Sequence, residues 1–286
     1  MKKIEQLDAL IFIDTNILLD FYRIRTSDVS LKYLEKIEEN MNRLITGDQV
    51  AMEYKKNRQK VILESLSKFK NPDWNSLTPP AILSSAQPVK IINDKKKEII
   101  SQQNKLKTRI EGILARPQYN DDVYKVLQRI FKNNSEYNLD REKKDRFKIR
   151  NLAKKRFLLG YPPRKKDDNS IGDAINWEWI IECAIRSGKD IVLVSRDTDF
   201  GASFNNESYL NDWLKQEFSE RVGKKRKIIL TDKLAYAFKL VDIVVTKAME
   251  EEEDQIIKSE KGKLIMPKNT ETDFFERMKK YFDKDE

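Results

Sequence analysis

The 286-residue sequence contains no histidine, a single cysteine (Cys183), and only eight glycines and eight prolines. Without histidine, the chain cannot use Ser-His-Asp or Cys-His catalysis, a histidine zinc site, or a histidine general base. One cysteine excludes an internal disulfide and a cysteine-built zinc cluster. Chemistry at neutral pH must therefore come from carboxylates, lysines, tyrosines or a bound hard cation.

Other familiar signals are also missing. There is no G-x-x-x-x-G-K-[ST] segment, so the sequence lacks a P-loop for nucleotide phosphates. It has no run of about eighteen apolar residues, and its N-terminus does not read as a charged-then-apolar leader. We therefore expect a cytoplasmic protein that does not act at a membrane.

Charge is abundant and unevenly placed. Charged residues make up 36% of the chain, and the net charge is +9. Between Lys90 and Arg156 there are 20 lysines and arginines against 9 acidic residues. A cationic segment beside a nearly neutral body favours a polyanion partner, nucleic acid before membrane. A solvated helical face is the ordinary alternative, and charge alone leaves it open.

The hydrophobic pattern predicts one α/β domain with elaborations. Short buried strands are expected at residues 9–13, 43–47, 190–195 and 227–231. Helices are expected at residues 29–41, 48–69, 173–188, 207–220 and 232–240. Alternating strands and helices indicate a central parallel sheet. We expect the domain to span residues 1–246, with a basic helical insertion at about 71–150 and a charged tail at 247–286 that is compatible with a helix.

Acidic residues follow or flank the most apolar segments. Asp14 ends the strand in "LIFIDTNILLD", and Asp197 and Asp199 follow "DIVLVS". Asp173 precedes a buried helix, and Glu53 lies early in the helix after "RLITG". Ligands of open α/β sheets lie at the carboxyl ends of the strands, so these acids could share one rim.

A cluster of carboxylates needs a counterion, because the charges repel. Oxygen ligands without histidine or cysteine favour Mg²⁺ or Mn²⁺. Two such ions, about 3.5–4 Å apart, can drive phosphodiester hydrolysis.

Each acid also has an ordinary explanation. Asp14 could cap the following helix, and Asp173 after Gly172 could do the same. Asp197 and Asp199 could form a turn. Glu53 is unremarkable in a helix rich in glutamate and lysine. The combination, rather than any one residue, favours a metal site.

The order of these segments resembles the PIN-domain nucleases. The resemblance is carried by "FIDTNILLD", "VAMEYKKN", "GDAINWEWIIECA" and "IVLVSRDTDF". The stretch "PPRKKDDNSIGDAINWEWII" is similar to the PIN-like DUF4935 branch, in which a Pro-Pro loop precedes a Gly-Asp-x-x-x-Trp helix. Arg164 stands where a glycine is expected in that loop. The resemblance covers about residues 8–70 and 150–242.

The resemblance implies a PIN-like three-layer α/β/α fold and a divalent-metal-dependent endonuclease, with RNA favoured over DNA. It implies catalytic roles for Asp14, Glu53, Asp173 and Asp197. Asp14 and Asp197 would bind the metal directly, Asp173 would bridge or bind through water, and Glu53 would orient a metal-bound water. Asp199 could be a further metal ligand or hold a turn. In bacteria, such an enzyme would act as a toxin or an antiphage effector.

The resemblance also implies residues that support the acids and residues that bind nucleic acid. Asn16 and Ser195 match polar residues that buttress the acids. Candidate phosphate contacts are Arg164, Lys165, Lys166 and Arg196, together with the other basic residues between 90 and 166. A homodimer and a regulatory or inhibitory protein partner are further expectations.

Two alternatives remain. The first is a catalytically silent PIN-like module that binds nucleic acid or protein. The second is a phosphatase of the haloacid-dehalogenase type with Asp14 as its nucleophile. That class needs an aspartate two positions later, where this sequence has Asn16.

Overall fold

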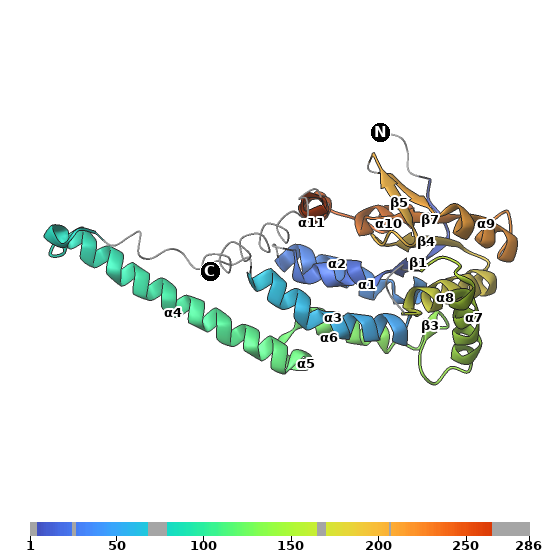
Figure 1. Ribbon diagram of the computed structural model, residues 1–286, viewed down its shortest axis with the longest axis horizontal. Coiled ribbons are helices and arrows are strands. Elements are labelled where there is room, and N and C mark those ends of the chain that lie inside the picture. The colour runs from blue at the N-terminus through green and yellow to red at the C-terminus, as the bar shows by residue number, and fades with distance from the viewer. Residues whose placement is uncertain (1–4, 25–26, 68–78, 165–169, 206, 265–286) are drawn as a thin grey trace, which may run out of the picture.

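The computed structural model describes residues 5–24, 27–67, 79–164, 170–205 and 207–264 (Figure 1). A five-stranded parallel sheet with strand order β3-β2-β1-β4-β7 forms its centre. The strands are β1 (Ala9–Ile13), β2 (Leu44–Gly47), β3 (Asn138–Leu139), β4 (Asp190–Val194) and β7 (Ile228–Thr231). The predicted α/β class with a central parallel sheet is confirmed.

Strand β1 lies in the middle of the sheet because every one of its side chains is apolar and buried. It pairs with β4 along its whole length, from Ala9 opposite Asp190 to Ile13 opposite Val194. Two parallel strands in this register end at the same level. The residues that follow them, Asp14 and Ser195, therefore emerge side by side at the carboxyl rim.

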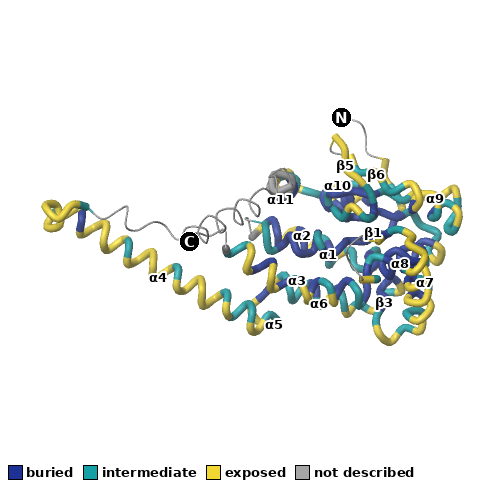
Figure 2. Tube along the Cα trace, viewed as in Figure 1, coloured by how far each residue is buried: buried dark blue, intermediate teal, exposed yellow. Residues whose placement is uncertain are grey.

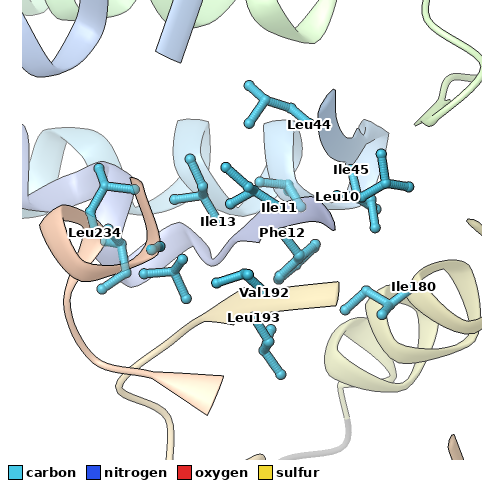
Figure 3. Packing of buried hydrophobic residues seen from close by; sticks show 14 of the residues in the cluster. Leu10, Ile11, Phe12, Ile13, Leu44, Ile45, Ile180, Val192, Leu193 and Leu234 are labelled. Atoms are coloured by element: carbon cyan, nitrogen blue, oxygen red, sulfur yellow. The ribbon is translucent and has the colours of Figure 1, made fainter. Parts of the chain in front are cut away.

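Helices cover the sheet and seal its core. Helix α8 contacts β2 and β4, whereas α10 contacts β4 and β7. Figure 3 shows Ile180 of α8 and Leu234 of α10 in the cluster that surrounds Phe12 and Val192.

The α-helices are α1 (Thr15–Leu19), α2 (Ser27–Glu39), α3 (Asp48–Ser67), α4 (Gln87–Ala115), α5 (Pro117–Asn120), α6 (Asp122–Phe131), α7 (Asp145–Leu159), α8 (Gly172–Ser187), α9 (Asp212–Arg221), α10 (Leu234–Leu240) and α11 (Lys247–Leu264).

Helix α4 is a long arm that extends away from the sheet (Figure 1). Its 29 residues correspond to about 43 Å of helix. Most of its surface is exposed, and Val89 is its one buried residue (Figure 2). Among the described residues, α4 is held mainly near its C-terminal end, where it contacts α5 and where the Ile113 carbonyl accepts a hydrogen bond from Arg58 of α3.

The segment expected to be a basic helical insertion, about 71–150, is more than an appendage. Residues 71–78 lie outside the described residues. Strand β3 pairs with β2 through Thr46 opposite Asn138, and α6 packs on α2. The later part of this segment thus belongs to the sheet and its helical cover. The domain boundaries themselves stay a prediction.

A hairpin replaces the start of one predicted helix. The helix expected at 207–220 begins at Asp212, because β5 (Gly201–Phe204) and β6 (Glu207–Leu210) form an antiparallel pair before it. Asn211 caps α9 by accepting hydrogen bonds from the N–H groups of Trp213 and Leu214. The polar β6 residues do not alternate clearly enough to predict a strand.

The C-terminal region is helical as far as it is described, since α11 ends at Leu264. Residues 265–286 of the predicted tail lie outside the described residues. Within the described part of the chain, no helix is both long enough and apolar enough to cross a membrane.

Candidate metal centre

Asp14 holds the centre of the site. It is buried, with 5% of its surface exposed, and it also serves as the N-cap of α1. Its Oδ1 accepts a hydrogen bond from the N–H of Thr15 at 2.6 Å. Its Oδ2 accepts hydrogen bonds from Asn16 Nδ2 at 2.9 Å and from the hydroxyl of Ser195. Asp14 can therefore cap α1 and belong to the site at the same time, because Oδ1 accepts the capping hydrogen bond and Oδ2 accepts those from Asn16 and Ser195.

The environment of Asp14 resists its negative charge. The pKa of Asp14 is raised to about 6, mainly by burial and also by the nearby carboxylates of Asp197 and Glu53. The hydrogen bonds from Ser195 and Thr15 oppose this rise without cancelling it. A buried carboxylate that is partly stabilised by donors, but repelled by its neighbours, is what a cation site needs.

Glu53 reaches the site from α3 and is held in place by three neighbours. Its Oε2 accepts a hydrogen bond from Thr15 Oγ1 at 3.2 Å, and its Oε1 accepts one from Gln49 Nε2 at 2.6 Å. Gly172, at the start of α8, leaves room for it: a Cβ atom there would lie 2.2 Å from Glu53 Oε1. The position of the Glu53 side chain on α3 therefore depends on a glycine at the start of the neighbouring helix α8.

Three further acids gather beside this pair. Asp173, Asp197 and Asp199 each place a carboxylate oxygen within 4.8 Å of the others. Asp173 lies in the first turn of α8, whose N-cap is Ile171, so Asp173 is not the cap of this helix. Asp197 Oδ1 accepts from the N–H of Asp199 at 3.2 Å, so the turn explanation also holds.

Ser195 joins the two groups of acids. Its hydroxyl donates to Asp14, and its Oγ accepts from the N–H of Asp197 at 3.0 Å. The strand ends, α3 and the start of α8 thus bring all five predicted acids to one rim. The donor set consists of carboxylate oxygens, which fits a hard divalent cation such as Mg²⁺ or Mn²⁺.

The predicted phosphate contacts have different environments. Arg164 is exposed, with its guanidinium 4.7 Å from the centre of the Phe157 ring. Arg196 is 14% exposed, forms an ion pair with Asp20 and donates to the carbonyl of Asp232. Lys165 and Lys166 lie outside the described residues. Contacts of these four residues with nucleic acid stay a prediction.

Not every arginine of the basic segment is available. Arg156 is buried and forms an ion pair with Glu178 at 2.8 Å and a second with Glu217. Arg221 pairs with the same two glutamates at 2.8 Å. This cluster fixes α8 between α7 and α9, and its arginines support the fold rather than bind a phosphate.

Sequence reasoning missed Thr15, Gln49 and Gly172. Gln49 lies four residues before Glu53, on the same face of α3, and this spacing could have identified it. The role of Gly172 depends on the distance between α3 and α8, which no local pattern contains.

A comparison with protein families gives an independent result. The family model of the PIN-like domain matches residues 10–200, which is about two thirds of the chain. The match includes the five acids and runs through the basic segment. Searches of curated proteins and of solved structures return no match.

Proposed function

Because the chain belongs to the PIN-like domain family, we propose that it is a divalent-metal-dependent endonuclease that hydrolyses phosphodiester bonds. The convergence of Asp14, Glu53, Asp173, Asp197 and Asp199 carries this proposal. The excess of basic residues between Lys90 and Arg156 supports nucleic acid as the substrate. The choice of RNA over DNA rests on the resemblance to PIN-domain nucleases.

The acids divide into two roles in this proposal. Asp14, Asp173, Asp197 and Asp199 would hold Mg²⁺ or Mn²⁺, with Ser195 and Asn16 fixing the Asp14 carboxylate. A bound divalent ion supplies charge stabilisation at the phosphate and lowers the pKa of a water. Glu53, oriented by Gln49 and Thr15, would accept a hydrogen bond from the attacking water and direct its lone pair.

The test is a cleavage assay on four labelled substrates: single-stranded RNA, single-stranded DNA and the corresponding duplexes. Each is incubated with protein in Mn²⁺, Mg²⁺ or EDTA. We expect metal-dependent cleavage of single-stranded RNA and none in EDTA. Asp14→Asn should abolish it, whereas Asp94→Asn, on the exposed arm α4, should not. Full cleavage in EDTA, or by Asp14→Asn, would overturn the proposal.

We also propose that the nuclease acts as a toxin or an antiphage effector, because uncontrolled RNA cleavage arrests a cell. Induced expression in bacteria should stop growth with the wild-type chain and not with Asp14→Asn at equal protein level. Equal growth arrest by both would contradict this role.

A further inference from the structure

A second pocket lies one helical turn from the acids. It has a volume of about 160 Å³ and opens at the β2–β3 edge, between α3 and α8. Gln49, which holds Glu53, lines it on one side. Ile175 and Asn176, which follow Asp173 on α8, line it on the other. Anything bound in this pocket is therefore next to the metal centre.

Three residues that line this pocket each carry a polar side-chain atom that has no hydrogen-bond partner among the described residues. These atoms are Asp48 Oδ2, Arg146 Nε and Asn176 Nδ2, and all three are buried. Asn176 is only 4% exposed. Arg141 Nε lies 3.5 Å from Asp48 Oδ2, which is an ion-pair distance but a long one. Buried groups without partners cost free energy, so three of them on residues lining one pocket favour a ligand toward which these side chains can turn.

One part of the pocket wall is apolar. Met52, Leu139, Ile175 and the ring of Trp179 line the same pocket. Trp179 is fixed there, because its Nε1 donates to the carbonyls of Thr46 and Tyr137, both at 3.0 Å. A flat, partly apolar ligand with a polar edge suits such walls better than a lone phosphate, which the carboxylate of Asp48 would repel.

We propose that this pocket binds one base of the RNA strand, a guanine or a uracil. Both bases place a carbonyl oxygen beside a ring N–H. With these side chains turned toward the base, its carbonyl, with two lone pairs, would accept from Arg146 and Asn176, and the ring N–H would donate to the Asp48 carboxylate. Adenine and cytosine place an amine, which donates, and an unprotonated ring nitrogen, which accepts, at the equivalent positions. The ring nitrogen can accept from only one of the two side-chain donors, so the other donor is left without a partner.

The arginines at the rim extend this site to a nucleotide. Arg150 is exposed, and the side chain of Arg141 is 79% exposed. Both line the pocket and can contact the phosphates on either side of the bound base. The inference rests on the proposed nuclease function, since it assigns the base that lies next to the cut bond.

Binding can be measured without cleavage. Fluorescein-labelled hexaribonucleotides, all adenosine or with one guanosine, uridine or cytidine in the middle, are titrated with protein in EDTA and followed by anisotropy. We expect guanosine or uridine to strengthen binding by about tenfold or more over adenosine and cytidine. Asn176→Asp, which replaces the donor by an acceptor, and Arg146→Met should each remove this preference. Arg129→Met, whose exposed arginine pairs with Glu38 elsewhere, should keep it.

The outcomes separate the two proposals. Equal affinity for all four hexamers in the wild-type protein would overturn the base pocket, even if RNA is cleaved in Mn²⁺. A base preference that survives both Asn176→Asp and Arg146→Met would also overturn it. A preference in EDTA without any cleavage in Mn²⁺ would support the pocket and refute the nuclease.

Discussion

Asp14 couples the stability of the fold to the metal site. The pKa of Asp14 is about 6 in the folded chain, above its ordinary value near 3.8. The unfolded chain therefore holds the ionised carboxylate more favourably, and Asp14 destabilises the metal-free fold at neutral pH. The effect is absent below about pH 4 and reaches roughly 3 kcal/mol above pH 6, in proportion to the pKa difference.

This predicts a pH-dependent effect of Asp14→Asn. In EDTA, the free energy of unfolding of wild type relative to Asp14→Asn should fall by roughly 3 kcal/mol between pH 4 and pH 7, because only the wild type ionises a buried group. Urea unfolding at several pH values measures it. Excess Mn²⁺ at pH 7 should stabilise the wild type more than the variant. Parallel curves for the two proteins in EDTA would contradict the prediction.

Gly172 gives a second prediction at the residue scale. In Gly172→Ala, the new Cβ would lie 2.2 Å from Glu53 Oε1 and 2.7 Å from Gln49 Nε2, so Glu53 must move. We expect cleavage to fall by about a hundredfold, as for other small displacements of catalytic groups. Gly112→Ala is the matched control, because its Cβ would lie 3.5 Å from Asn120 Nδ2, an ordinary contact. Equal activity of the two variants would contradict this role.

At this scale the sequence predicted which acids gather at the rim but not how they are held. Asp14, Asp173 and Asp197 could be chosen because each adjoins an apolar segment whose end faces the rim. The contacts of Thr15 and Gly172 with Glu53 depend on the packing of α1, α3 and α8. Such contacts join residues far apart in the chain, and local patterns do not encode them.

Among the elements, α3 and α6 are joined by a buried ion pair. Arg58 Nη2 and Asp121 Oδ2 are 2.6 Å apart, both side chains are at most 4% exposed, and Tyr22 also donates to Asp121. Asp121→Ala would leave Arg58 buried without its counterion. We expect a loss of about 3–5 kcal/mol in the free energy of unfolding. Asp122→Ala, which breaks an exposed pair with Lys125, should cost less than about 1 kcal/mol. Similar losses in both variants would contradict the account.

The arm α4 is proposed to hold nucleic acid through its charge. Changing the exposed residues Lys105, Lys107 and Arg109 to glutamate should weaken RNA binding in EDTA and lower the slope of log affinity against log salt by about 2. The control changes Lys224, Lys225 and Arg226 to glutamate. These residues precede β7 and therefore lie at the amino end of this strand, whereas the acids lie at the carboxyl ends of the strands. An equal loss of affinity in both triple variants would refute a specific role for the arm.

Strongly apolar strands and long helices were predictable, whereas a two-residue strand and a polar hairpin were not. The sequence predicted β1, β2, β4 and β7 and the helices α3 and α8 close to their observed bounds. It did not predict β3, because two residues carry no periodicity, nor the polar hairpin of β5 and β6. Strand β3 is defined by its pairing with β2, which is a property of the assembled sheet.

On the scale of the whole molecule, acids gather at one end of the parallel sheet, and the arm α4, which has more basic than acidic residues, extends away from the sheet. Figure 1 shows the direction of the arm. The two features have opposite charge and complementary roles in the proposed function. Cations of the arm attract the polyanion, and the acids at the rim hold the ions that act on it. A silent binding module would need the arm but would have no use for the carboxylate cluster.

The most direct measurement is therefore a calorimetric titration of Mn²⁺ into the metal-free protein at pH 7.5. The account predicts saturable binding by the wild type and its loss in both Asp173→Asn and Asp197→Asn, with the thermal stability of these variants in EDTA unimpaired. Absence of saturable binding by the wild type, or binding by both variants as strong as that of the wild type, would contradict it.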